Sequence, residues 1–285
     1  MIYLLLAVIA LAVFLYIEDK WITVTEYTYE SEKIPEAFDG YIILHVSDLQ
    51  SAYFGREQKN LLKKSQETKP DAIFFTGDLV DRNRTDLKAS MIAAEGLQKT
   101  APVYFVSGNH ETRIEDRLDE FYSEMEGSNI ILLRNDVYRL QHRGQHINIA
   151  GIWDDVLCEC KLGERRRDTS IDPAPLQKVM SELTEKLSEN EFNILLTHEP
   201  QFFDHYVNDK IDLAFAGHAH GGQIRLPFTD GLFAPGQGIM PKLTSGMRKK
   251  GKTTMVISRG LGNSVFPFRV FNRPELVVVK LKKKS

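Results

Sequence analysis

The chain has 285 residues, of which 42% are hydrophobic, so it is long enough to bury the core of one large domain. Its formal net charge of −3, with 26% charged residues, excludes both a nucleic-acid-coating protein and a disordered acidic chain. The two cysteines, Cys158 and Cys160, are separated by one residue, which is poor spacing for a disulfide. We therefore expect two unpaired thiols.

The first seventeen residues, MIYLLLAVIALAVFLYI, carry no charged side chain and are followed by three charged ones. As a helix they would span about 25 Å, the short end for crossing a bilayer. A signal peptide would need a basic start and a small-residue cleavage site, and neither is visible. Trp21 lies where an interfacial anchor would.

These features predict a single-pass membrane anchor over residues 1–20, followed by one folded domain over residues 21–285. A cleaved signal sequence and a soluble or interfacial helix are the alternatives. Lys20 stands beside two acids, so the flanking charge leaves the side of the membrane open, and we favour the extracytoplasmic side.

The alternating residues 21–31 predict a first strand directly after the anchor. From Tyr41 onward, apolar strands alternate with helices. The strands are expected at residues 41–47, 71–77, 102–108, 192–197 and 211–217, and the helices at residues 56–69, 85–99 and 113–125. Residues 129–152 look like a meander or hairpins, and the tail from residue 253 adds further strands. This pattern predicts an α/β domain whose core is two sheets flanked by helices.

Each buried strand ends in a short polar cluster: SDLQ, GDLVDR, GNHE, THEP and GHAHGG. Ligands of α/β sheets bind beyond the carboxyl ends of the strands, so five such ends would share one cleft. One cluster alone is weak evidence, because Asp and Asn form turns. The side chains that would meet are Asp48, Gln50, Asp78, Asn109, His110, His198, His218 and His220.

In this order, the clusters resemble the motifs of the calcineurin-like metallophosphoesterase family: D-x-H, G-D, G-N-H-E/D, an isolated H and G-H-x-H. The extended GHAHGGQIRLP and the late SRGLG and N-x-PEL look like its membrane-associated bacterial branch, which includes cell-wall-linked and lipid-sugar-related phosphoesterases. The resemblance covers about residues 40–283. It implies a four-layer α/β/β/α sandwich, here with an N-terminal hydrophobic helix, and a centre of two divalent metal ions.

The resemblance also implies a role for each matching residue. Asp78 would bridge the two metals; Asp48, Gln50 and His220 would complete one site, and Asn109, His198 and His218 the other. Carboxylate, amide and imidazole ligands suit Mn, Fe or Zn, with Mn favoured. The metals would supply an activated hydroxide that attacks the phosphoester. His110 would protonate the leaving group.

Gln50 departs from the family pattern, which usually has histidine at this position. A glutamine oxygen is a weaker, neutral donor for Zn or Fe and suits harder ions such as Mn or Mg. Since every other ligand position is kept, we expect an active hydrolase in which the metal site that includes Gln50 is modified. The alternative is a membrane-tethered, non-catalytic metal- or ligand-binding protein.

Three residues beside the motifs, Arg82, Gln223 and Arg225, are candidates for substrate binding. The charged segments at residues 151–155 and 164–168 form a loop that overhangs the cleft or is simply solvated. Glu111 either orients His110 or stabilises a helix start. His45, His142, His146 and His205 are expected outside the site.

The anchor motivates a lipid-linked or envelope-derived phosphoester as substrate, with a phosphodiester favoured because His110 can serve an alkoxide leaving group. No nucleic acid is expected as a partner, since no basic stripe with interleaved aromatics is visible.

Overall fold

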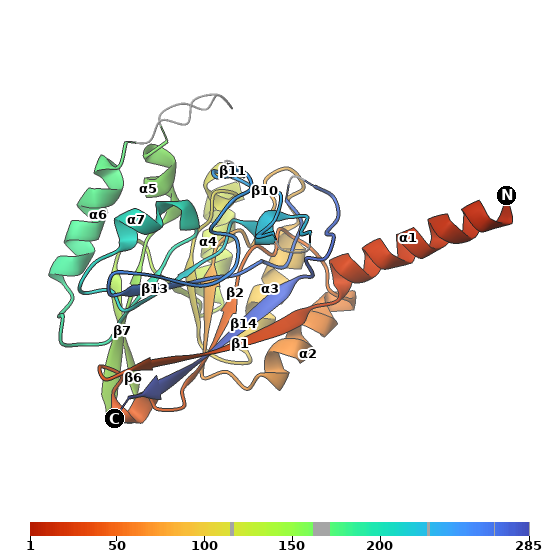
Figure 1. Cartoon of the computed structure of the whole chain (residues 1–285). Helices are drawn as coiled ribbons and strands as arrows, with labels where there is room; N and C mark the ends of the chain where they lie inside the picture. The colour runs from red at the N-terminus through yellow and green to blue at the C-terminus, as the bar shows by residue number, and fades with distance from the viewer. Residues whose placement is uncertain (115–116, 162–171, 227–228, 265, 285) are drawn as a thin grey trace.

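The computed structural model describes residues 1–114, 117–161, 172–226, 229–264 and 266–284 (Figure 1). Its core is a pair of six-stranded sheets, with helices on both outer faces. The segment 164–168, proposed above to overhang the cleft, lies outside the described residues.

The first sheet has the strand order β1-β14-β2-β3-β4-β5. Its strands β2, β3, β4 and β5 run parallel, β14 is antiparallel to β2, and β1 is parallel to β14. The sheet therefore joins both ends of the domain, because β1 and β14 pair over nine residues from Thr23↔Glu275 onward. Its strands are β1 (Thr23–Ser31), β2 (Ile42–Val46), β3 (Ala72–Thr76), β4 (Val103–Val106), β5 (Ile131–Leu132) and β14 (Glu275–Lys283).

The second sheet has the order β12-β13-β9-β8-β7-β6, with hairpins at both edges and parallel strands in the middle. Its strands are β6 (Val137–His142), β7 (Gln145–Gly151), β8 (Asn193–Leu196), β9 (Leu213–Ala216), β12 (Gly246–Lys250) and β13 (Thr253–Ile257). A small separate hairpin pairs β10 (Phe233–Ala234) with β11 (Gly238–Ile239).

Three apolar clusters define four layers, as the sequence predicted. One packs α2, α3 and α4 on the first sheet, the second fills the space between the sheets, and the third packs α5, α6 and α7 on the second sheet. The continuous apolar strands are thus buried on both faces. The helices are α2 (Lys59–Glu67), α3 (Leu87–Gln98), α4 (Leu118–Gly127), α5 (Asp154–Glu159), α6 (Ala174–Glu185) and α7 (Phe203–Tyr206).

Two helices begin later than the hydrophobic pattern indicates. The helix predicted from residue 56 begins at Lys59, because Glu57 and Gln58 have φ of 51° and 59° and turn the chain out of the α conformation. The helix predicted from residue 113 begins at Leu118 and ends at Gly127.

Helix α1 (Ile2–Lys20) projects from the body of the protein (Figure 1). Its mean hydropathy is 2.2 and nearly all of it is exposed, so length and composition allow it to cross a membrane; a signal sequence would share these properties. Glu18 in its last turn is 3% exposed, because it packs into the folded domain. The end of the helix is therefore part of the domain structure.

Candidate metal centre

The polar clusters that follow five strands meet at one edge of the two sheets. β2, β3 and β4 of the first sheet and β8 and β9 of the second each lead into one cluster. Backbone hydrogen bonds join neighbouring loops: the N–H of Asp48 donates to the carbonyl of Gly77 at 3.0 Å, and that of Gly217 to the carbonyl of His198 at 2.9 Å. Parallel strands thus bring together side chains that are far apart in sequence.

Two groups of buried side chains could each hold a metal ion, and both include Asp78. One group is Asp48, Asp78 and His220; the other is Asp78, His198 and His218. In each group the candidate ligand atoms all lie within 4.8 Å of one another. Asp78 therefore lies where a carboxylate shared by two ions would be.

The backbone around these side chains is strained and closely packed. Asp48, Asp78, His218 and His220 all have positive φ, between 46° and 63°, which non-glycine residues rarely adopt. Such strain collects at functional sites, where the surrounding structure enforces it. Glycine is required nearby: a Cβ on Gly108 would collide with the carboxylate of Asp78.

Hydrogen bonds leave two imidazoles ready to act as ligands. Nδ1 of His198 lies 2.7 Å from the carbonyl of Thr76, and Nδ1 of His220 lies 3.2 Å from the carbonyl of Gly262. A carbonyl oxygen only accepts, so each Nδ1 donates and each Nε2 is turned toward the centre, where that of His198 also lies 3.1 Å from Nδ1 of His218. These Nε2 atoms lie 3.3 Å from Asp78 Oδ2 and 3.4 Å from Asp48 Oδ1, respectively.

Burial lowers the pKa of both His218 and His220, which keeps their imidazoles neutral and able to bind a cation. Burial alone would raise the pKa of Asp78, but the imidazoles of His198 and His110 outweigh it and hold the carboxyl far below its usual range. Asp78 is thus ionised at any physiological pH.

Two buried amide oxygens could join the donor set. Gln50 Oε1 and Asn109 Oδ1 are both buried and have no hydrogen-bond partner among the described residues. A buried acceptor left unpaired costs about 1–3 kcal/mol, which a cation at this point would offset. The residues present therefore fit a pair of divalent ions. The side chain of Gln50 points into the centre, since its Nε2 donates to Asp78 Oδ2 at 2.7 Å.

His110 is 8% exposed and lies at the edge of this centre. The backbone N–H of Arg82 donates to its Nδ1 at 3.1 Å, so the neutral form of the ring carries its proton on Nε2, which lies 3.9 Å from Asp78 Oδ2. Burial alone would lower the pKa of His110, but the carboxylates of Asp78 and Asp81 outweigh burial and raise it.

Asp81 is a residue that the sequence reasoning missed. Its Oδ1 lies 3.6 Å from Nδ1 of His110, and its side chain is 4% exposed. The motif GDLVDR could have indicated Asp81, because its second carboxylate follows the first by three residues on the same loop.

Glu111 has a role that the sequence reasoning did not consider. Its carboxylate accepts hydrogen bonds from the backbone N–H groups of Asp78 (2.8 Å), Val80 (3.1 Å) and Gly108 (2.7 Å). It thus ties the loop after β3 to the loop after β4. Glu111 holds Asp78 in place rather than orienting the His110 ring.

A second buried polar group beside His198 was also missed. Asp154 and Glu199 are fully buried, and Glu199 forms an ion pair with Lys161. Burial, reinforced by the charge of Glu199, raises the pKa of Asp154 well above its usual value. Of the segment 151–155, Asp154 therefore lies within the fold rather than on a solvated loop. Cys158, whose Sγ donates to Asp154 at 3.3 Å, is free, as is Cys160.

The three candidate substrate residues differ in their surroundings. The Arg82 guanidinium has no recorded partner among the described residues, whereas Arg225 donates to Ser245 Oγ at 2.9 Å and to the Gly221 carbonyl at 3.3 Å. The side-chain oxygen of Gln223 accepts from the backbone N–H of Phe266 at 2.9 Å, and Gln223 borders a narrow gap beside His220 that is too small for a water molecule. Their predicted contacts with substrate stay predictions.

The other histidines lie away from the metal groups. His45 is fully buried between the sheets, with its Nε2 2.8 Å from Thr76 Oγ1. His142 packs on Phe38, and His146 pairs with Glu191 at 3.1 Å.

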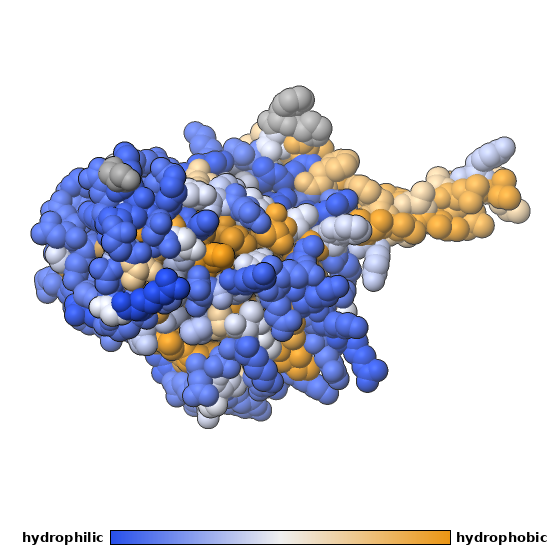
Figure 2. Space-filling view, turned by 90° about the horizontal axis from the view of Figure 1, so that it is seen from below, coloured by the Kyte–Doolittle hydropathy of each residue, from blue (hydrophilic) through white to orange (hydrophobic). Residues whose placement is uncertain are grey.

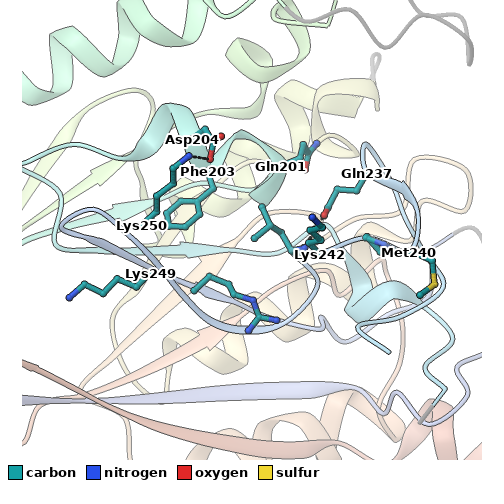
Figure 3. A pocket seen from close by; sticks show the side chains of 11 residues that line it. Gln201, Phe203, Asp204, Gln237, Met240, Lys242, Lys249 and Lys250 are labelled. Carbon is teal, nitrogen blue, oxygen red and sulfur yellow. Dashed lines mark hydrogen bonds and ion pairs between the residues drawn. The ribbon is translucent and has the colours of Figure 1, made fainter. Parts of the chain in front are cut away.

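A separate hollow of about 620 Å³ is lined by β12 and the segments around Gln201 and Gln237. Figure 3 shows the side chains around it. Its basic side chains include Lys249 and Lys250, and Lys250 pairs with Asp204 at 2.6 Å. None of its lining residues belongs to the two metal groups.

The fold and the two candidate metal groups that share Asp78 are of the kind found in metal-dependent hydrolases, and comparison with known proteins gives the family. The chain belongs to the calcineurin-like phosphoesterase family, whose model matches residues 41–222. Members of this family are metal-dependent phosphoester hydrolases.

Two bacterial relatives are similar over most of the chain. The uncharacterized metallophosphoesterase YkuE of Bacillus subtilis is 32% identical over 277 residues, which cover 94% of this chain and 88% of the relative. An uncharacterized metallophosphoesterase of Aquifex aeolicus is 26% identical over 286 residues, which cover 97% of this chain and 98% of the relative. Among solved structures, a dimetal phosphatase from Danio rerio gives a TM-score of 0.47 at 12% identity and covers 78% of this chain and 88% of that chain.

Proposed function

We propose that this protein is a membrane-anchored phosphoesterase of the membrane-associated bacterial branch of its family, and that it hydrolyses lipid-linked or envelope-derived phosphodiesters. The observation that carries the proposal is the pair of buried metal-ligand groups that share Asp78. Apolar helix α1 supports the membrane part, and we favour an extracytoplasmic domain.

Seven side chains would hold two divalent ions. Asp48, Gln50, Asp78 and His220 would hold one; Asp78, Asn109, His198 and His218 the other. The unpaired amide oxygens of Gln50 and Asn109 are hard donors, which favours Mn over Zn. When bound, such ions lower the pKa of water and neutralise charge on the phosphoryl oxygens.

The chain's own residues handle the leaving group. The carboxylates of Asp78 and Asp81 raise the pKa of His110 and so favour its imidazolium form, which can donate the Nε2 proton, on the side that faces Asp78, to the leaving-group oxygen and remain as a neutral imidazole. Asp81 stabilises the protonated ring, because its carboxylate lies 3.6 Å from Nδ1. An alkoxide leaving group of a phosphodiester needs this proton most.

The test is an assay of the full chain, purified in detergent, after removal of metals with a chelator. Addition of Mn should restore hydrolysis of bis(4-nitrophenyl) phosphate, and metal analysis should find two ions per chain. An Asp78→Asn variant should lose the hydrolytic activity and both metal ions, because the two ligand groups share the Asp78 carboxylate. Metal binding without turnover on phosphomonoesters or phosphodiesters would instead support the non-catalytic, membrane-tethered alternative.

A further inference from the structure

Three exposed phenylalanines lie close together in sequence near the end of the chain. Phe266, Phe268 and Phe271, called the aromatic rim here, are 39%, 36% and 61% exposed. Phe271 also has a φ of 50°, which is unusual for a bulky residue and is kept only where the structure enforces it. Exposure and strain together indicate that Phe271 serves a purpose other than packing a core.

The aromatic rim continues the apolar surface of α1. The ring of Phe271 packs edge-on against Phe14, with 5.5 Å between the ring centroids. Phe14 precedes Trp21 by seven residues, or about 10 Å along the helix. If α1 crosses the bilayer with Trp21 at the interface, Phe271 lies within the apolar layer. Figure 2 shows apolar side chains on the body of the protein beside the base of the helix.

Hydrogen bonds fix the rim relative to the helix. Glu18 accepts from Nε of Arg273 at 2.8 Å and from the backbone N–H of Asn272 at 3.2 Å. Asp19 accepts from the backbone N–H of Arg269 at 2.7 Å. The segment that carries the rim therefore cannot turn away from α1 without breaking buried hydrogen bonds.

The same segment reaches the candidate metal centre. Phe266 and Phe268 surround a narrow gap, too small for a water molecule, together with His220 and Gln223. One end of the rim thus meets the apolar helix, and the other borders a proposed metal ligand.

From this geometry we infer that the aromatic rim inserts into the outer layer of the lipid bilayer and holds the loop beside His220 at headgroup depth. The inference rests on the proposed function, because it takes α1 as a membrane anchor. It narrows the substrate class to phosphoesters in the headgroups of membrane lipids, because the rim would hold the candidate metal centre beside the bilayer surface.

The depth of fluorescent labels in the bilayer tests the insertion of the aromatic rim directly. The full chain with Cys158→Ser and Cys160→Ala is reconstituted in phosphatidylcholine vesicles and labelled with an environment-sensitive fluorophore at Phe268→Cys, Phe271→Cys or the control Tyr138→Cys. Tyr138 is similarly exposed, at 38%, on edge strand β6. Labels at 268 and 271 should be quenched by lipids that carry a nitroxide on the acyl chain, and the label at 138 should not. Equal, weak quenching at all three positions would overturn the inference, and would leave the rim as a surface for a protein partner.

A matched pair of substrates, one soluble and one in vesicles, tests whether the aromatic rim brings lipid substrates to the site. Phe271→Asn removes the ring, and asparagine tolerates positive φ better than phenylalanine, so the fold should be kept. Hydrolysis of soluble bis(4-nitrophenyl) phosphate should be unchanged, while hydrolysis of phosphatidyl-4-nitrophenol in vesicles should fall roughly tenfold. An equal rate on vesicles for both proteins would contradict a role in delivering lipid. Failure of the proposed function itself looks different: neither substrate would be hydrolysed, while the labels would still report the depth of the rim.

Discussion

Asp19 accepts a hydrogen bond from the backbone N–H of Arg269 at 2.7 Å, across 250 residues of sequence. The guanidinium of Arg269 is buried and donates to the carbonyl of Gly262, the same carbonyl that lies 3.2 Å from Nδ1 of His220. A continuous set of hydrogen bonds therefore joins the last turn of α1 to a candidate metal ligand. The apolar helix is attached to the domain as a fixed element rather than as a flexible tether.

This attachment predicts that the end of α1 contributes to stability. Glu18→Ala should lower the free energy of unfolding by about 2 kcal/mol, because it leaves a buried N–H and the Arg273 guanidinium without their acceptor. Urea unfolding in detergent, followed by near-UV circular dichroism, measures the change. The control is Glu26→Ala at an exposed position, which should stay within about 0.5 kcal/mol of the parent. Equal stability of both variants would show that α1 is only loosely attached.

Replacement of Gln50 by histidine should strengthen one metal site. An imidazole is a better donor than an amide oxygen for Zn or Fe, so Gln50→His should retain its first ion at higher chelator concentration. Metal analysis after dialysis against graded chelator measures this, and assays in parallel report metal dependence. Identical metal content and metal dependence in both proteins would mean that residue 50 is not a ligand.

Glu111 should matter for stability as well as for metal binding. Glu111→Ala leaves the three backbone N–H groups of Asp78, Val80 and Gly108 buried without an acceptor, so we expect a loss of about 3 kcal/mol or more. Metal affinity should fall too, because the Asp78 loop is no longer tied to the loop after β4. Urea unfolding of the metal-free protein separates the two effects. Exposed Glu120→Ala is the matched control, and a similar small loss in both variants would contradict the role given to Glu111.

The role of His110 predicts a dependence on the leaving group. His110→Gln should slow hydrolysis of an alkyl phosphodiester by about 10²–10⁴-fold, the usual contribution of general acid catalysis. The loss on bis(4-nitrophenyl) phosphate should be smaller, since nitrophenolate leaves without a proton. Metal content should be unchanged. A loss of equal size on both substrates would argue that His110 supports the site in another way.

His45 predicts a sensitivity to acid. Burial lowers its pKa to about 3 in the folded protein, against about 6.5 in the unfolded chain. The unfolded state therefore binds the proton first, and the folded state loses stability as pH falls from about 6.5 toward 3. Between pH 7 and pH 5, the free energy of unfolding should fall by about 2 kcal/mol because of His45 alone.

The comparison with His45→Gln isolates this contribution, because the other titrating groups are common to both proteins. The parent should lose about 2 kcal/mol more than the variant between the two pH values, measured by urea unfolding. Equal losses would mean that His45 is protonated in the folded state.

The sequence by itself determined the four layers and the strand-end clusters. Short apolar runs such as residues 71–77, rich in aromatic and β-branched residues, indicate strands covered on both faces, and glycine beside Asp or His marks the turns that follow them. These are local properties, set by periodicity and by backbone preference. The family could be identified from the order of the clusters for the same reason.

Only the tertiary structure decided what surrounds each side chain. Glu111 is three residues from Gly108 in sequence, but its role depends on backbone groups of another loop. The contacts of Glu18 and Asp19 with residues near the end of the chain exist because β1 and β14 pair side by side, and no local pattern encodes a partner 250 residues away. For the same reason, the placement of Phe271 against the apolar helix could not be predicted from an exposed phenylalanine in a loop.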